Sequence, residues 1–220
     1  MEELVVLDHP AVADRIARVR DAATPTPVFR RLIEELGAFI AYEATRALET
    51  VEARVDTPIA AARVRRIARR PVVAPILRAG LGLLPGFLSV IDEAIVAHLG
   101  FFRDPETLAA IPYYANLPHD LAGVPVYLLD PMLATGNSAI AAIELLAAHG
   151  ATDLWFLSVL AAPEGVRAVR AAHPRARLVT CALDHHLNDH GYIVPGLGDA
   201  GDRMFGSTSS VPVSFRAPVR

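Results

Sequence analysis

The stretch VYLLDPMLATGNS at residues 126–138 decides the fold expected for this chain. It begins with a continuous apolar run, as in a strand that is buried on both faces of a parallel sheet. Asp130 then stands at the expected carboxyl end of that strand, and the small-residue turn 134–138 leads into a helical pattern over 139–148. We therefore expect a strand, a tight turn and a helix in direct succession, the unit from which α/β sheets are built.

The turn has the composition of an anion site. Its backbone N–H groups, the hydroxyls of Thr135 and Ser138 and the N-terminus of the following helix can all point at one anion, and a phosphate monoester fits such a concavity. Open α/β sheets place ligand contacts at the carboxyl ends of strands, so Asp130 is placed to hold sugar hydroxyls or a metal-bound diphosphate. An ordinary βα connection shares this pattern, because glycine-containing βα turns also occur without ligands.

The composition indicates a packed globular protein. Of the 220 residues, 53% are hydrophobic and 20% are charged, which argues against a disordered chain. The net charge of −3 gives no general attraction for nucleic acid or anionic membranes. The single cysteine, Cys181, allows no internal disulfide, and no apolar run reaches the roughly 20 residues of a membrane span. We expect a cytoplasmic protein that binds neither nucleic acid nor membrane.

The remaining pattern alternates between helices and strands. Two amphipathic helices are expected over 10–23 and 26–48, with Asp8 and Thr26 as their caps. Residues 51–58 fit a strand or an arm outside the main sheet, and the stretch 59–70 predicts no definite structure. Buried strands are expected over 71–77, 94–102, 126–129, 154–161 and 177–183, and helices over 83–91, 139–148 and 163–172. This alternation predicts a doubly wound parallel α/β sheet.

Two arginines are predicted at the sheet edge that holds Asp130. Arg78, in RAGLG, and Arg103 each follow directly after a buried strand. The carboxyl ends of parallel strands meet at one edge, and a guanidinium group suits a diphosphate. The convergence of two arginines and one carboxylate indicates a ligand site more strongly than any of the three alone.

Two irregular segments are expected near the same edge. Residues 104–120 contain prolines and paired tyrosines, which predicts a flexible excursion or β-hairpin that acts as a lid. Residues 184–206 hold five glycines, three histidines and four aspartates with little periodic hydrophobicity. Glycine exposes backbone groups that can read a planar heterocycle, although a surface loop has a similar composition. The histidines lack the helical spacing of a zinc motif, so no protein-ligated metal is expected.

Taken together, these motifs resemble the uracil phosphoribosyltransferases, a type I phosphoribosyltransferase family. The resemblance runs from His9 to Ser207 and rests on PILRAGLG at 75–82, DPMLATG at 130–136, AAPEG at 161–165 and HGYIVPGLGDAGDRMFG at 190–206. It implies one domain over 1–207, built of N-terminal helices, a β-hairpin arm, the doubly wound parallel sheet and a C-terminal hood over 184–207. The tail 208–220 is interpreted as disordered or as an oligomer contact.

The resemblance also implies an activity. Uracil and 5-phosphoribosyl 1-diphosphate (PRPP) become UMP and diphosphate, a pentosyl transfer of pyrimidine salvage. Mg²⁺ is expected to bind mainly through the diphosphate of the substrate, the chain to form a homodimer or higher homo-oligomer, and GTP to be a candidate effector. Two alternatives stay open: a non-catalytic nucleotide-binding regulator on the same fold, and transfer to another nucleobase.

The family motifs imply roles for particular residues. Asp130, Arg103 and Asp199 are the implied catalytic residues. Arg78 and Arg103 are implied at the diphosphate of PRPP. The implied ribose 5-phosphate contacts are Asp130, Pro131, Met132, Leu133, Ala134, Thr135, Gly136, Asn137 and Ser138, with Asp199 facing the ribose. The implied uracil contacts are Ile193, Gly198, Asp199 and Ala200.

Several positions depart from the residues usual in the family, among them Pro27 and Val28 in place of a basic pair, and two departures bear on activity. Asn137 stands where a second glycine is usual, and we expect asparagine to tolerate a left-handed backbone there. His186 replaces a small residue in the predicted hood. These two departures motivate the alternative of a regulator without turnover.

Overall fold

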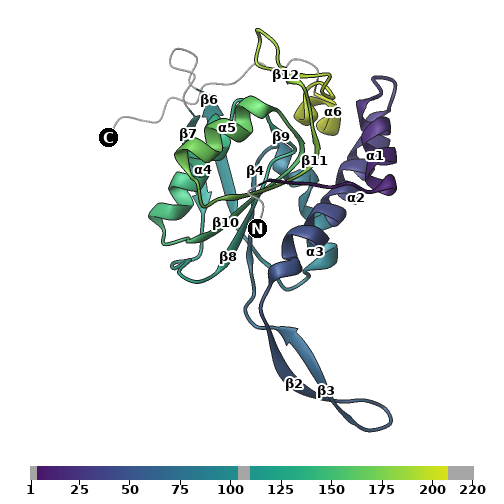
Figure 1. The fold of residues 1–220 in the computed structure, drawn as a ribbon, viewed down its shortest axis with the longest axis vertical. Coiled ribbons are helices and arrows are strands. Elements are labelled where there is room, and N and C mark those ends of the chain that lie inside the picture. Colours follow the sequence, from purple (N-terminus) through teal and green to yellow (C-terminus); the bar gives the residue numbers. More distant parts are fainter. Residues whose placement is uncertain (1–3, 104–109, 208–220) are drawn as a thin grey trace.

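A parallel sheet forms the centre of the molecule (Figure 1). The computed structural model describes residues 4–103 and 110–207. The strand order is β1-β11-β10-β8-β4-β6-β7, and of these neighbouring pairs only β6 and β7 run antiparallel. The strands are β1 (Leu4–Val6), β4 (Val72–Leu77), β6 (His98–Arg103), β7 (Ala110–Asn116), β8 (Pro125–Leu129), β10 (Asp153–Ala161) and β11 (Arg177–Leu183). Short strands β5 (Ile95–Val96) and β9 (Met132–Leu133) pair with β4 and β10.

Helices cover both faces of this sheet, which confirms the doubly wound α/β prediction. They are α1 (Pro10–Arg20), α2 (Thr26–Ala44), α3 (Leu84–Val90), α4 (Asn137–Ala148), α5 (Pro163–Ala172) and α6 (Ala200–Phe205), with 3₁₀ turns η1 (Thr45–Ala47) and η2 (Ala79–Gly82). Tyr127 and Leu129 of β8 belong to the core beneath α1, α2 and α3. Val126 and Leu128 belong to the core beneath α4 and α5. Because side chains alternate along a strand, a continuous apolar run supplies both cores.

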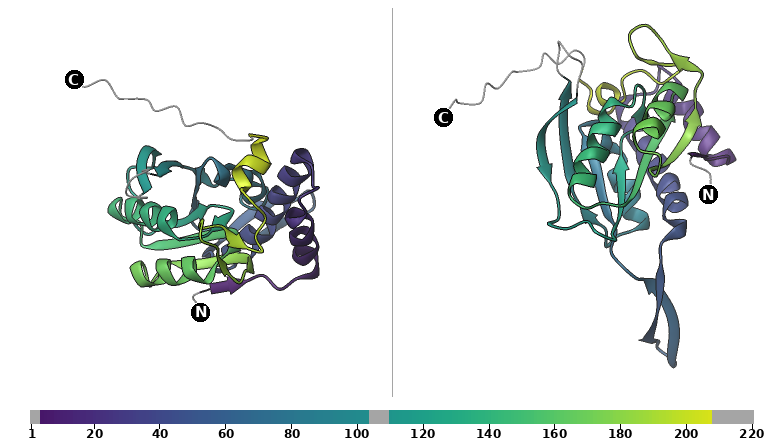
Figure 2. Two further views of the ribbon diagram at one scale, coloured as in Figure 1. Left: turned by 90° about the horizontal axis from the view of Figure 1, so that it is seen from above. Right: turned by 60° about the vertical axis from the view of Figure 1, so that its left-hand side comes forward.

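The arm lies outside the main sheet, as predicted for residues 51–58. β2 (Thr50–Asp56) and β3 (Ala61–Ile67) pair only with each other, in antiparallel register. Figure 2 shows this hairpin projecting away from the body of the molecule. The stretch 59–70, for which the sequence predicted no definite structure, supplies the turn and the second strand.

The helix starts correct two sequence predictions. The cap of α1 is His9 and not Asp8, since Nδ1 of His9 accepts the N–H of Ala11 at 3.0 Å. Pro10 is the first helical residue, which makes its predecessor the cap. Thr26 is already helical and makes no side-chain capping bond. The expected lengths were also too generous, because α1 ends at Arg20 and α2 at Ala44.

Two further segments differ from or refine the prediction. The strand expected over 94–102 is divided into β5 and β6, which pair with opposite ends of β4. Pro75 lies between those two paired stretches and has no N–H to donate, which interrupts the ladder. Residues 110–116 form a β-hairpin with β6, one of the two structures predicted for 104–120. Residues 104–109 and the tail 208–220 lie outside the described part of the chain.

Candidate functional site

A cavity of about 380 Å³ lies at the carboxyl edge of the sheet. Its wall brings together the turn after β8 and the C-terminal segment, whose residues are far apart in the sequence. Of the residues predicted for the site, those on the wall are Asp130, Met132, Leu133, Ala134, Thr135, Gly136, Asn137, Ser138, Ile193, Gly198, Asp199 and Ala200. Sequence reasoning did not identify Ala79, Phe156, His190 and Tyr192, which also line it.

The turn after β8 is a left-handed glycine followed directly by a helix. Gly136 has φ +88° and precedes α4, which begins at Asn137. Asn137 is therefore helical, and the left-handed backbone expected there is found one residue earlier. Asparagine at position 137 is therefore not strained, because the right-handed helical region is allowed for every L-residue. The first three residues of the 12-residue helix α4 line the cavity, where the N–H groups of the first helical turn favour an anion.

Close packing against α5 fixes the carbonyl side of the same turn. A Cβ at Gly165 would lie 2.4 Å from the oxygen of Ala134 and 2.9 Å from that of Leu133. Pro131 does not line the cavity; its carbonyl oxygen instead accepts the N–H groups of Val159 and Leu160 of β10. The AAPEG motif thus contributes a backbone support for the turn, a role that spacing alone did not reveal.

Asp130 is held at the end of β8 with its carboxyl group facing the cavity. Its Oδ1 accepts the N–H of Met132 at 3.2 Å. Burial is the main cause that raises the pKa of Asp130 to about 7; the hydrogen bond from Met132 opposes this rise and the negative charge of Asp199 adds to it. A carboxyl group so poor in partners has unused capacity for hydroxyl donors or for a cation brought in with a ligand.

The two predicted arginines differ in what the structure describes. Arg78 follows β4 after a cis peptide bond, and its side chain is directed to α6 rather than to the cavity wall. Its Nη2 lies 3.9 Å from Oδ1 of Asp202, and its Cζ lies 5.9 Å from the Phe205 ring centroid. Arg103 ends β6 as predicted, but its side chain lies outside the described part of the structure.

The C-terminal segment folds over the cavity as a small hairpin and helix. Strands β12 (His186–Leu187) and β13 (Ile193–Val194) pair antiparallel, and Asp199 caps α6 by accepting the N–H of Asp202 at 2.8 Å. Ile193 and Ala200 are buried, while Gly198, at φ +82°, adopts a left-handed conformation on the wall. His186 is exposed on β12 and is not among the residues that line the cavity.

Three arginines that sequence reasoning missed attach this segment to the N-terminal helices. Arg30 donates two hydrogen bonds to the oxygen of Met204, and Arg203 donates to the carbonyl oxygens of Val19, Leu197 and Asp21. Arg20 pairs with Asp184. No local signal marks these residues, because their partners are mostly more than 160 positions away.

Metal-ligating side chains do not form a cluster in the described residues. No group of three His, Cys, Asp or Glu side chains suited to a metal ion occurs within residues 4–103 and 110–207. Asp130 and Asp199 are the two carboxylates on the cavity wall. In the same ranges, no helix combines the length and hydropathy needed to cross a bilayer.

Comparison with known proteins places this architecture in a family. The family model for uracil phosphoribosyltransferase matches residues 6–207. Uracil phosphoribosyltransferases from Symbiobacterium thermophilum and Caulobacter vibrioides are 49% and 50% identical over 208 residues, which cover 94% of this chain and 100% of each relative. The AQ2163 protein of Aquifex aeolicus superposes with a TM-score of 0.89 at 36% identity, covering 94% of this chain and 100% of that one. Adenine phosphoribosyltransferase from Leishmania donovani, at 13% identity and a TM-score of 0.57, shares the fold over 84% of this chain and 85% of its own. The chain belongs to the uracil phosphoribosyltransferase family.

Proposed function

We propose that the cavity at the carboxyl edge of the sheet is where this chain transfers the phosphoribosyl group of PRPP to uracil, giving UMP and diphosphate. Uracil phosphoribosyltransferase activity, a pentosyl transfer, is the function of the family to which the chain belongs. One observation carries the assignment to this site: a single cavity joins an anion-binding turn to a glycine-rich segment suited to a planar base. A donor and an acceptor bound there lie next to each other.

The turn 134–138 binds the 5-phosphate in this proposal. The helix α4 begins at the cavity, and Thr135 and Ser138 add hydroxyl groups to its N–H groups. Asp130, one residue beyond β8, accepts hydrogen bonds from the ribose hydroxyls. Asp199 faces the ribose from the other wall. The two carboxylates therefore bracket the sugar between the turn and the hood.

The diphosphate of PRPP binds two arginines in this proposal. Arg78 and Arg103 both follow strands that end at this edge, so we assign them to the leaving group. In the structure Arg78 faces Asp202 across 3.9 Å, and both side chains are partly exposed, so this pair is weak. A diphosphate would offer Arg78 a stronger, charge-assisted partner.

The hood, residues 184–207, binds uracil in this proposal. Ile193 supplies an apolar contact, and the backbone of residues 198–200 presents N–H and C=O groups to the edge of the base. Breaking the bond between C1 of the ribose and the diphosphate develops positive charge on the sugar and negative charge on the leaving group. Asp130 and Asp199 stabilise the first charge, Arg78 and Arg103 stabilise the second, and the hood orients the attacking nitrogen of uracil.

Mg²⁺ fits the donor set of this site. Magnesium commonly binds through one or two carboxylates together with substrate phosphates, and the wall offers the two carboxylates of Asp130 and Asp199. When bound with PRPP, Mg²⁺ neutralises charge on the diphosphate. Asp130 is the protein ligand best placed for it, since burial leaves its carboxyl group with few partners of its own.

A homo-oligomer is also part of the proposal, and the arm supports it. Along the arm, Val51, Ala53 and Val55 share one face with Ala62 and Val64. Ile59 at the turn is 96% exposed. A two-stranded hairpin is marginally stable by itself, so a second copy of the chain is the expected cover for this face. Light scattering on the full chain tests it: a mass near 23.6 kDa, that of one chain, would contradict the oligomer.

Three further expectations stay predictions. They are GTP as an effector, a cytoplasmic location, and the 104–120 segment as a lid.

A steady-state assay tests the function directly. The chain is mixed with uracil, PRPP and Mg²⁺, and UMP is followed by chromatography; we expect turnover that depends on all three. If no UMP forms above background at millimolar substrate, the proposal is wrong. Replacing uracil by cytosine or hypoxanthine separates transfer to another base, and UMP binding by calorimetry without turnover would favour the regulator alternative.

A further inference from the structure

The base-facing hood is locked to helix α1 by one ion pair. Arg20, the last residue of α1, donates from Nη1 to Oδ2 of Asp184 at 2.9 Å and to the carbonyl oxygen of Gly196 at 2.8 Å. Its Nη2 also donates to the other carboxylate oxygen of Asp184. The N–H of Gly196 donates to Oδ2 of Asp184 at 2.9 Å. Arg20 and Asp184, which we call the hood clamp, thus hold both polar groups of Gly196.

The carboxylate of the hood clamp is buried, although the clamp lies outside the cavity wall. The Asp184 side chain is 4% exposed and that of Arg20 is 24% exposed, and neither lines the cavity. Burial acts to raise the pKa of Asp184, but the hydrogen bonds from Arg20 and Gly196 outweigh it and leave the pKa below its usual value. Asp184 is therefore charged at neutral pH, and removing Arg20 leaves a buried carboxylate without its cation, which is costly.

Gly196 is the point from which the clamp acts on the base site. It has φ +65°, and a Cβ there would lie 2.2 Å from the carbonyl oxygen of Ile193. The chain therefore folds tightly back on itself between Ile193 and Gly196. Both residues that flank this turn on the cavity side, Ile193 and Gly198, are implied uracil contacts. Rotation of the Gly196 peptide would move the backbone of both.

Arg203 connects Leu197, the residue after Gly196, to the same end of α1. Its Nη1 donates to the carbonyl oxygen of Leu197 at 2.8 Å, and its Nη2 donates to that of Asp21 at 2.6 Å. Its Cζ lies 4.3 Å from the centroid of the Phe29 ring. Two arginines thus fix consecutive residues of the hood, Gly196 and Leu197, against the loop that follows α1.

We propose that Arg20 and Asp184 are positioning residues for uracil, which hold the Gly196 peptide so that residues 193–198 present their backbone to the base. The proposal rests on the function proposed above and adds a determinant of base affinity that does not touch either substrate. Among the described residues, the hydrogen bonds of the clamp go to Gly196 and not to the donor turn 134–138, and Asp199 is held separately as the cap of α6. The clamp therefore acts on uracil and not on PRPP.

Steady-state kinetics of Arg20→Ala test this separation. We expect the KM for uracil to rise about tenfold, equivalent to about 1.4 kcal/mol, while kcat and the KM for PRPP change less than twofold. Arg20→Lys should recover part of the loss, because an ammonium group keeps the charge but cannot bond Asp184 and Gly196 in the same fork. A merely structural residue would not separate the two substrates.

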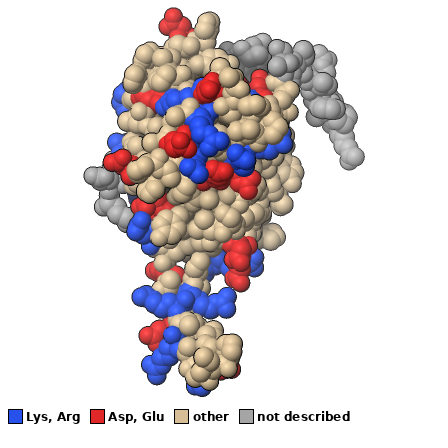
Figure 3. Space-filling model, turned by 90° about the vertical axis from the view of Figure 1, so that its right-hand side faces the viewer, with Lys and Arg blue, Asp and Glu red and all other residues tan. Residues whose placement is uncertain are grey.

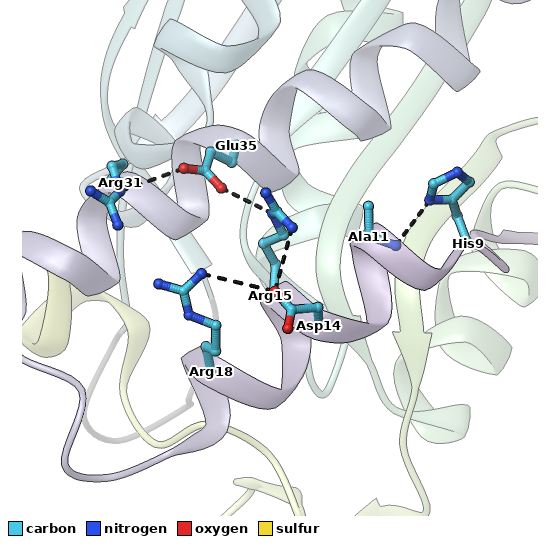
Figure 4. A network of polar contacts seen from close by, with 7 residues as sticks. All are labelled: His9, Ala11, Asp14, Arg15, Arg18, Arg31 and Glu35. Atoms are coloured by element: carbon cyan, nitrogen blue, oxygen red, sulfur yellow. Dashed lines mark hydrogen bonds and ion pairs between the residues drawn. The ribbon is translucent and has the colours of Figure 1, made fainter.

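Arg15→Ala is the matched control. Arg15 lies on the same helix, and its side chain is 30% exposed. It bonds the carboxylates of Glu35 of α2 at 3.0 Å and of Asp14 at 3.4 Å (Figure 4). Both partners lie on the N-terminal helices and neither belongs to the hood, so both KM values should stay within twofold of the wild type.

Equal rises in both KM values for Arg20→Ala, unchanged values, or the same uracil effect in Arg15→Ala would overturn the proposal. If Arg20→Ala does not fold, Arg20→Lys and Asp184→Asn decide it by the same ratio of KM values. If the wild type makes no UMP, the proposed function fails. The positioning role of Arg20 and Asp184 is then tested by measuring ligand binding with calorimetry. Arg20→Ala should then bind UMP about tenfold more weakly and ribose 5-phosphate unchanged; equal losses for both overturn the proposal.

Discussion

The two walls of the cavity are built in different ways. The donor turn 134–138 is held by the sheet itself, through the strand before it, the helix after it and the close approach of Gly165 to Ala134. The hood is held by side chains, with Arg20, Arg30 and Arg203 bonded to carboxylate or carbonyl groups. The donor wall is therefore rigid by construction, whereas the hood depends on contacts that single substitutions can remove without disturbing the sheet.

Asp130→Asn should have the largest effect, because in the proposed reaction it removes a carboxylate next to the ribose, where positive charge develops. We expect turnover to fall at least tenfold, about 1.4 kcal/mol in the transition state, with the fold unchanged by circular dichroism. Asp199→Asn tests the same charge from the hood side and should also lose at least tenfold. Wild-type rates in both variants would mean that the site lies elsewhere.

Gly165→Ala should disturb the donor wall without touching a substrate. The new Cβ meets the backbone oxygens of Ala134 and Leu133, so the turn must shift. We expect the KM for PRPP to rise about sixfold, about 1 kcal/mol, with a smaller change in the KM for uracil. Ala171→Ser, on the exposed side of the same helix, is the control and should match the wild type. A larger effect on uracil than on PRPP would contradict the division between the walls.

The raised pKa of Asp130 predicts that the charged carboxylate, which the proposed reaction needs, lowers the stability of the folded state. Its carboxyl group binds a proton up to about pH 7 in the folded state, whereas the ordinary value is 3.8. The folded state therefore holds more protons between these values, and its stability falls as the pH rises through about 7. Asp130→Asn lacks this loss, so its advantage in unfolding free energy over the wild type should grow by roughly 2–3 kcal/mol between pH 5 and pH 8. Urea unfolding at both pH values measures it, and a difference that does not vary with pH would argue against the raised pKa.

Arg203→Lys tests the hood by a milder change than loss of the clamp. A lysine keeps the charge but cannot reach the carbonyl oxygens of Leu197 and Asp21 together. We expect the KM for uracil to rise about threefold, about 0.6 kcal/mol, and the KM for PRPP to stay within the error of the assay. Arg18→Lys, on an exposed part of α1, is the control. Equal changes in both constants would show that the hood does not act separately on the base.

The same division explains what the sequence could predict. The donor wall follows from local rules, since an apolar run predicts the buried strand and small residues predict the turn. Cys181 and its neighbours in β11 were likewise expected from their apolar pattern. The hood anchors were not, because Arg20 and Asp184 meet across 164 positions and their types are ordinary for a surface helix and a loop. Arg78 was placed at the correct strand end, but the direction of its side chain depends on α6, which no local pattern encodes.

Asn137→Gly should have the smallest effect, although this residue is the clearest departure from the family pattern. The sequence predicted a left-handed backbone at Asn137, which asparagine was expected to tolerate. The structure places that conformation at Gly136 and makes Asn137 the first residue of α4, with right-handed geometry. Glycine at a helix start costs only a few tenths of a kcal/mol to about 1 kcal/mol of stability. We therefore expect kcat and the KM for PRPP to change less than twofold.

The matched test is Gly136→Ala, which forces a Cβ into the left-handed position 3.2 Å from the oxygen of Gly165 and should raise the KM for PRPP severalfold. If Asn137→Gly instead increased turnover severalfold, Asn137 would be shown to lower the activity of the donor turn. That result would support the alternative that the chain is a nucleotide-binding regulator.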